Sequence, residues 1–307
     1  MLYSLRRAIL YRTVVVIVLS VVTSSVTAQE LMPRAYWPAP KGTNLIVAGY
    51  QHSSGDVMTD QTLPIDGVDS ELNFAQITYQ RTFSLFDRSA NIQFNLPYAW
   101  GVTKGEVEGE FMEREVSALS DARVLLSVNL LGAPSMDGKE FQALRAKPRP
   151  ILGASILIQA PTGEYDPDKV INVGTNRWST KLALGGIWPI RPTWLLEVEA
   201  GVWLFSDNDE FVGTTRQQDP IYSAAFYLVK RIRPGFWASL DLNYYSGGRS
   251  TIDGDARFDW QRNSRIGATL LFPVRGRHAI RMSASTGITT RTGGDYNTFS
   301  IAYARAW

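Results

Sequence analysis

The sequence predicts an all-β fold: a transmembrane, antiparallel up-and-down β-barrel of about 12 strands. Three observations predict it. Apolar and polar residues alternate over stretches of about 10 residues. The connections between these stretches alternate between short turns and longer polar loops. After the N-terminal segment, no apolar run approaches the roughly 20 residues that a membrane-spanning helix needs.

Composition excludes several classes of function. The 307 residues carry 31 Lys and Arg against 29 Asp and Glu, with 2 His and no Cys. This near-neutral balance argues against a nucleic-acid partner, which would require a basic face. Disulfides and thiolate metal sites are excluded, and two histidines leave little room for a His-rich metal centre. We expect no metal, no cofactor and no enzymatic activity.

The N-terminal segment has the pattern of a secretory signal peptide. Three early arginines without an acid precede an apolar run at 13–22, and small residues end the segment at Val26-Thr27-Ala28. The run is short for a retained anchor across about 30 Å of hydrocarbon. We therefore predict a signal peptide over 1–28, cleavage between Ala28 and Gln29, and an exported barrel domain over 29–307. The expected destination is the outer membrane of a Gram-negative bacterium.

The alternation defines the strands. In the segment 90–100, Ile92, Phe94 and Leu96 share one face and Asn91 lies on the opposite face. A soluble sandwich alternates too, but soluble strands average about 5–6 residues and these are about twice as long. The expected strands are 43–54, 71–84, 90–102, 116–131, 150–160, 176–188, 193–205, 220–231, 236–246, 258–272, 278–288 and 296–307.

The connections are asymmetric, as in outer-membrane barrels with short periplasmic turns and long extracellular loops. The tight turns are expected at 86–89, 189–192, 232–235 and 273–277. The longer polar loops are expected at 55–70, 103–115, 161–175, 206–219, 247–257 and 289–295. Trp188, Trp194 and Trp203 fall near strand ends, where aromatic girdles meet the membrane interfaces. The last strand ends on Trp307, an aromatic terminus that the barrel-assembly machinery is expected to read.

One long connection, 132–150, falls on the side of the short turns. Asp137 and Glu140 have the spacing of an N-terminal capping box, and Phe141 and Leu144 fall on one helical face before Pro148 ends the segment. This predicts a short helix. It either constricts the lumen at the periplasmic mouth or lies on the surface, and the sequence leaves both open.

A continuous block is more specific than the alternation. It contains Leu131-Gly132-Ala133-Pro134, Ile151-Leu152-Gly153-Ala154-Ser155, Pro161-Thr162-Gly163-Glu164-Tyr165-Asp166 and Asn172-Val173-Gly174-Thr175-Asn176-Arg177-Trp178-Ser179. This block resembles the outer-membrane "transporter" family associated with the meta-cleavage pathway of phenol degradation. The resemblance implies an outer-membrane β-barrel that passes hydrophobic or aromatic compounds, without catalytic residues. Arg177 and Trp178 are expected at the outer rim as an interfacial cation and a girdle aromatic.

If the apolar faces meet lipid, the charged positions on the opposite faces line the lumen. A charge on the lipid face would cost roughly 2–4 kcal/mol at the midplane. The candidate lumen residues are Arg123, Lys181, Glu197, Glu199 and Asp241, with Arg265 and Arg281 as weaker candidates. These charges either contact a passing solute or pair across a packed lumen. An open porin typically needs 16–18 strands, so the predicted lumen is narrow.

The expected function is passive passage of small solutes, among them hydrophobic or aromatic compounds. Two alternatives stay open: a non-conducting barrel for adhesion or envelope structure, and a rim hydrolase of the phospholipase type. The latter depends on His52 and Ser54, which share one strand face as a base and nucleophile would. Acidic loop runs around Asp207 and Asp253 offer oxygens that could bridge lipopolysaccharide through divalent cations, although such runs are more often solvated loop tips. The expected partners are therefore outer-membrane lipid, lipopolysaccharide, the assembly machinery and a small-molecule solute.

Overall fold

The computed structural model describes residues 33–56, 66–107, 110–292 and 295–307. The predicted signal peptide and its cleavage between Ala28 and Gln29 lie outside these residues. Within the described ranges, no helix is long and apolar enough to span a membrane.

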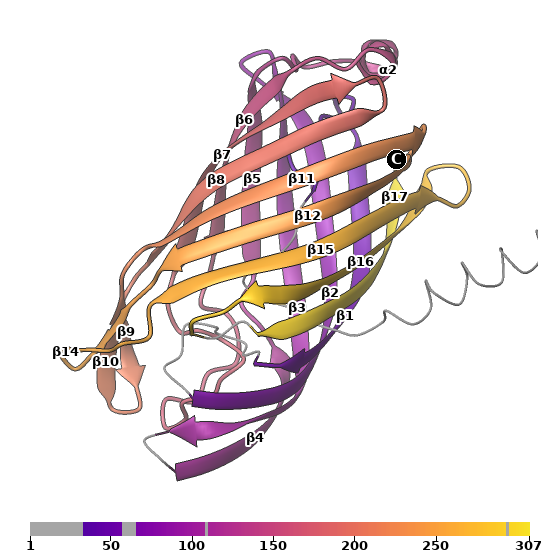
Figure 1. Cartoon of the computed structure of the whole chain (residues 1–307). Helices are drawn as coiled ribbons and strands as arrows, with labels where there is room; N and C mark the ends of the chain where they lie inside the picture. The colour runs from indigo at the N-terminus through magenta and orange to yellow at the C-terminus, as the bar shows by residue number, and fades with distance from the viewer. Residues whose placement is uncertain (1–32, 57–65, 108–109, 293–294) are drawn as a thin grey trace, which may run out of the picture.

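The strands form one closed antiparallel barrel with 12 strand positions, as predicted (Figure 1). The sheet order is β2-β1-β17-β16-β15-β12-β11-β8-β7-β6-β5-β3-β4, and pairing of β2 with β3 closes it. Its strands are β1 (Asn44–Gly55), β2 (Asp66–Leu85), β3 (Arg88–Val107), β4 (Glu110–Leu119), β5 (Arg123–Leu131), β6 (Ile151–Gln159), β7 (Ser179–Arg191), β8 (Trp194–Phe205), β11 (Ile221–Arg233), β12 (Phe236–Gly247), β15 (Gln261–Pro273), β16 (His278–Thr289) and β17 (Tyr296–Ala306).

The predicted strand 116–131 is wrong in one respect, because it is interrupted. β5 and β4 share one position in the barrel and pair with successive halves of the long strand β3. Between them, Asp121 is fully buried, and its carboxylate accepts hydrogen bonds from Gln159 Nε2 (3.0 Å), Gly163 N (2.9 Å), Thr175 N (3.0 Å) and Thr175 Oγ1 (2.7 Å). A carboxylate with these donors cannot face lipid, so the chain leaves the strand path at this residue.

Three predicted loops are also wrong. The segment 103–115 continues β3 and β4 as a hairpin. The segments 206–219 and 247–257 contain β9 (Asn208–Phe211), β10 (Thr214–Gln218), β13 (Ser250–Ile252) and β14 (Asp255–Ala256), which form a second sheet of four strands. Both hairpins turn through two positive-φ residues, Val212-Gly213 and Asp253-Gly254. Such primed turns match the twist of the flanking strands.

The two ends of the barrel differ, as predicted. At the turn end lie the short connections 86–87, 192–193, 234–235 and 274–277, together with α2 (Gly138–Ala146). At the loop end lie the longer connections and the second sheet, opposite α2 and the C-terminus (Figure 1). The predicted helix is confirmed: Asp137 Oδ1 accepts from Lys139 N and Glu140 N, and Glu140 Oε2 accepts from Asp137 N.

The barrel is apolar outside and polar inside. Along β3, Phe94, Leu96 and Tyr98 are exposed on the exterior, whereas Gln93 and Asn95 face the lumen. The main buried apolar cluster lies inside the turn end of the barrel, between the segment before β1, α2 and the inner wall of β6, β7, β8 and β11. Its members are Tyr36, Ala133, Met136, Leu144, Ile151, Ile187, Leu195, Ala225, Tyr227 and Val229. Helix α2 therefore packs against the mouth of the lumen.

Candidate functional site

The segment 33–43, which precedes β1, enters the lumen from the turn end. Its anchor is Tyr36, whose ring lies over Gly153 of β6 and Gly185 of β7. A Cβ added at Gly185 would lie 2.1 Å from the ring, and one at Gly153 would lie 2.4 Å from it. The Tyr36 hydroxyl shares a 2.9 Å hydrogen bond with Ser155 Oγ. Two glycines on the inner wall thus make room for a side chain from the N-terminal segment, which the sequence analysis did not predict.

Arg34 fixes the same segment to β8. Its backbone N donates to Glu197 Oε2 at 2.7 Å, and its guanidinium lies 3.5 Å from Glu197 Oε1. The guanidinium carbon also lies 3.9 Å from the centroid of the Trp37 ring. Burial, together with the positive charges of Arg231 and Arg145, lowers the pKa of Arg34 to about 10, against the opposing effect of Glu197. Arg34 therefore stays charged at neutral pH.

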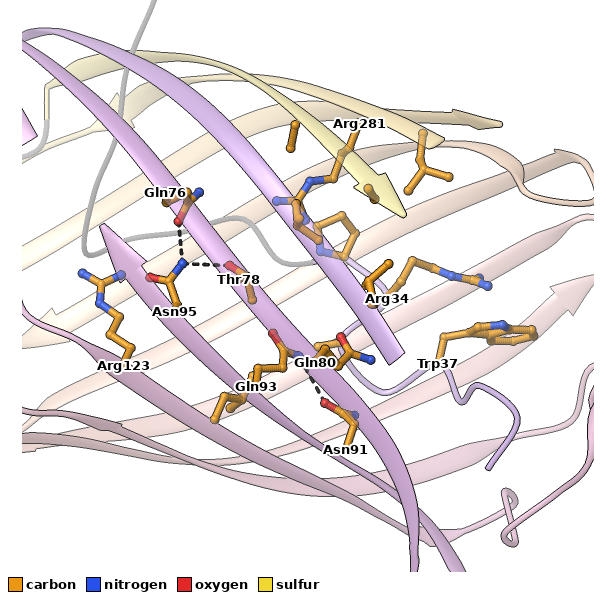
Figure 2. A pocket seen from close by; sticks show the side chains of 18 of the residues that line it. Arg34, Trp37, Gln76, Thr78, Gln80, Asn91, Gln93, Asn95, Arg123 and Arg281 are labelled. Carbon is orange, nitrogen blue, oxygen red and sulfur yellow. Dashed lines mark hydrogen bonds between the residues drawn. The ribbon is translucent and has the colours of Figure 1, made fainter. Parts of the chain in front are cut away.

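A cavity of about 220 Å³, the lumen cavity, lies beside this segment. Figure 2 shows neutral amides of β2 and β3 on one side of it and Arg34, Trp37 and Arg281 on the other. Asn95 Nδ2 donates to Gln76 Oε1 (2.9 Å) and to Thr78 Oγ1 (2.8 Å), and Gln93 Nε2 donates to Asn91 Oδ1 (3.1 Å). These hydrogen bonds satisfy much of the amide polarity. Arg123 of β5, paired with Asn95, adds a positive charge to this polar wall (Figure 2).

A second cavity of about 970 Å³, the mouth cavity, opens at the turn end between the N-terminal segment, α2 and the ends of β11 and β12. Side chains shared by both cavities are Pro33, Arg34, Trp37, Leu271 and Arg281. Trp37 and Arg34 thus stand between the lumen and the mouth.

The five predicted lumen residues have different surroundings. Arg123 lines the lumen cavity and donates from Nε to Gln159 Oε1 at 3.0 Å. Lys181 and Glu199 form an ion pair at 2.5 Å. Glu197 pairs with Arg34, and Asp241 is fully buried with Thr269 Oγ1 donating to its Oδ2 at 2.7 Å. The structure therefore places Arg123 beside the cavity and the other four in internal contacts, and their role in a solute path stays a prediction.

His52 and Ser54 lie away from the lumen cavity, on the outward face of β1. His52 Nδ1 lies 2.9 Å from Asn73 Oδ1, an atom that also accepts a hydrogen bond from the Tyr50 hydroxyl at 2.7 Å. Asn73 stands directly opposite His52 on the neighbouring strand β2. The sequence analysis did not identify this neighbour, because strand register cannot be read from the His-x-Ser spacing.

The expectation for Arg177 is wrong. Arg177 is buried rather than interfacial: its Nη2 donates to Gln218 Oε1 at 2.5 Å, and its guanidinium carbon lies 4.6 Å from the Phe205 ring centroid. Its neighbour Trp178 is exposed. Across the part of the chain that the structure describes, His, Asp and Glu side chains form no group of three able to hold a metal ion.

A closed 12-stranded barrel with an apolar exterior and a polar, partly filled lumen defines a transmembrane β-barrel of the outer-membrane type. The family described as "Putative MetA-pathway of phenol degradation" matches residues 51–303, so the chain belongs to this family. This confirms the resemblance seen in the sequence. No curated protein matches the chain.

Solved structures support the fold. The COG4313 outer membrane channel from Pseudomonas putida F1 superposes with a TM-score of 0.74 and 23% identity, covering 91% of this chain and 100% of that one. The β domain of the Bordetella autotransporter BrkA has a TM-score of 0.51 and 11% identity, with 87% and 100% of the two chains covered.

Proposed function

We propose that the protein is an outer-membrane channel for passive, gradient-driven passage of small solutes, among them hydrophobic and aromatic compounds. The observation that carries the proposal is the lumen cavity: about 220 Å³, lined by neutral amides, arginines, apolar side chains and the indole of Trp37. A small aromatic ring fits such a site, because it gains contact with the apolar side chains and a hydroxyl on the ring finds amide partners. No cofactor is required.

The membrane setting supports this proposal. An exterior with exposed Phe94, Leu96 and Leu184 suits hydrocarbon, since the alternation turns the polar side chains inward. In the proposed orientation the turn end faces the periplasm and the loop end faces outward. A cleaved signal peptide over 1–28 delivers the chain to the assembly machinery, and lipid and lipopolysaccharide surround the barrel.

The main alternative is a non-conducting barrel. The buried contacts of Arg34 and Tyr36 favour it, since they hold the segment 33–43 inside the lumen. The two cavities favour the channel, because the same Arg34 and Trp37 line both of them.

The rim hydrolase has one supporting observation, the contact between His52 and Asn73. Replacing Ser54 with Ala tests it in purified, refolded protein with a phospholipid substrate. Hydrolysis that survives the Ser54→Ala substitution excludes Ser54 as the nucleophile, and hydrolysis that is lost with it would establish the enzyme.

Solute flux into liposomes that carry the refolded protein tests the channel directly. The arms compare phenol, a sugar of similar size and small ions, each against protein-free liposomes. We expect phenol to enter liposomes that carry the protein faster than it enters protein-free liposomes. The protein should also increase the flux of phenol, relative to protein-free liposomes, more than it increases the flux of the sugar. Flux equal to that of empty liposomes for every solute would contradict the channel and favour the non-conducting barrel.

A further inference from the structure

The mouth cavity combines aromatic faces with an excess of positive charge. Its lining includes Trp37, Phe141, Phe236 and Trp237, and the arginines Arg34, Arg145, Arg231, Arg233 and Arg281. None of the described residues that line it is Asp or Glu. The lumen cavity next to it is lined by apolar side chains, neutral amides and the arginines Arg34, Arg123 and Arg281. Positive charge and aromatic faces are therefore more concentrated at the mouth.

Within the described part of the chain, most of this positive charge has no partner acid. Arg34 is neutralised by Glu197, and Arg281 is close enough to Asp241 for electrostatic interaction. For Arg145, Arg231 and Arg233, no ion pair with a carboxylate exists among the described residues. The Arg231 guanidinium instead donates to backbone oxygens, those of Arg145 and Pro192. Guanidinium groups that converge without an anion repel one another, and an anion bound between them would relieve this repulsion.

The arginines also lie over the aromatic rings. The guanidinium carbons of Arg145, Arg231 and Arg233 lie 5.5, 5.9 and 5.7 Å from the ring centroids of Phe141, Trp37 and Phe236, respectively. A ligand with a flat ring and an attached anionic group would use both features. Its ring would stack on the aromatic side chains, and its carboxylate would accept paired hydrogen bonds from a guanidinium.

We propose that the mouth cavity is a binding site for small aromatic carboxylates, and that the channel therefore favours aromatic anions over neutral or cationic aromatics. This inference rests on the proposed channel function and specifies its substrate class. Because the cavity is at the turn end, it would act where a solute leaves the lumen. It would draw anions past Arg34 and Trp37 by electrostatic attraction.

Equilibrium dialysis of the refolded protein in zwitterionic detergent tests the site without requiring transport. Benzoate is the probe, at about pH 7.5, where its carboxylate is ionised. Three comparison ligands each change one feature of benzoate. Cyclohexanecarboxylate lacks the aromatic ring, phenol lacks the negative charge, and benzylamine carries a positive charge instead. We expect benzoate to bind most tightly and benzylamine not to bind. Ligand uptake by protein-free micelles is subtracted from each measurement. The proposal would be overturned if phenol or benzylamine bound as tightly as benzoate.

The variant Arg231→Gln/Arg233→Gln should weaken benzoate binding about tenfold, since it removes two charged donors. The single variant Arg233→Gln keeps the test possible if the double variant does not fold, because Arg233 is exposed at the rim. It should weaken benzoate binding about threefold. Folding is checked by heat-modifiable gel migration. The matched control is Arg191→Gln, an exposed arginine at the same end of the barrel but outside the cavity lining.

Binding that is unchanged in the folded Arg233 variants, or weakened equally in the Arg191 control, would overturn the site. Phenol flux into liposomes separates the two proposals. Absence of all flux would contradict the channel while the dialysis result still decides the binding site.

Discussion

Arg34 and Glu197, 163 residues apart in the chain, are joined twice: the backbone N of Arg34 donates to one carboxylate oxygen of Glu197, and its guanidinium lies 3.5 Å from the other. This contact ties the segment before β1 to the inner wall of β8. It places Trp37 between the lumen cavity and the mouth cavity. The free width of the lumen therefore depends on a segment that is not part of the barrel wall.

We predict that Arg34→Ala loosens this segment. Removal of one partner of a buried ion pair costs about 3–5 kcal/mol when the other stays buried. Release of the segment would let water reach Glu197, so we expect a smaller loss of about 1–3 kcal/mol in the free energy of unfolding. Urea titration with heat-modifiable gel migration measures it. The double variant Arg34→Met/Glu197→Leu should recover most of the loss, and a double variant as unstable as Arg34→Ala would contradict this pairing.

We predict that Gly185→Ala displaces Tyr36, because the added Cβ would lie 2.1 Å from its ring. The overpacking should lower stability by about 1–3 kcal/mol and raise single-channel conductance. Adding Tyr36→Ala to Gly185→Ala should restore stability in part. The matched control is Gly138→Ala in α2, where nothing lies within 4 Å of an added Cβ. An unchanged conductance in Gly185→Ala would show that the Tyr36 ring does not hold the segment in the lumen.

We predict that Asp121→Asn loosens the loop end. The Asp121 carboxylate accepts from four donor groups, and an amide would replace one acceptor oxygen with a donor. The free energy of unfolding should fall by about 1–3 kcal/mol. Proteolysis within 161–178 should become faster. The control is Asp168→Asn, an exposed residue in the same connection. Equal proteolysis rates in the two variants would contradict a structural role for Asp121.

We predict that replacing α2 (Gly138–Ala146) with a short Gly-Ser linker raises conductance and reduces anion preference. The helix contributes Phe141, Gln142 and Arg145 to the lining of the mouth cavity. Reversal potentials in a salt gradient measure the preference. The sequence left open whether this helix constricts the lumen or lies on the surface, and an unchanged conductance would remove the constricting role.

The barrel strands could be predicted because lipid imposes a strict alternation. Each of Phe94, Leu96 and Tyr98 faces outward, and no residue between them does. Beyond the membrane this constraint ends. The pattern of 103–115 therefore predicts a loop where the structure has the hairpin of β3 and β4, since Lys104, Glu113 and Arg114 give it no apolar face. Asp253-Gly254 is a usable hairpin signal, because both central residues of a type I′ turn need positive φ and Asp-Gly is a preferred pair there.

The lumen could be predicted only in part. The inward charges follow from the alternation, but the partner of each does not. Arg34 lies before the first strand, where no periodicity predicts that it meets Glu197. The glycines at the inward positions 153 and 185 are the one sequence feature that indicates this contact. Without side chains of their own, Gly153 and Gly185 leave space for another part of the chain to pack against the inner wall. Likewise, only strand register brings Asn73 opposite His52.

Phenol flux into liposomes that carry either Gln93→Trp or Phe94→Trp tests the central claim, that solutes pass through the lumen. Gln93 lines the lumen cavity, and its neighbour Phe94 faces outward with 47% of its surface exposed. An indole at position 93 should fill much of the 220 Å³ cavity. We predict that Gln93→Trp lowers phenol flux at least about fivefold and that Phe94→Trp leaves it unchanged. Equal flux through the two variants would contradict passage through the lumen.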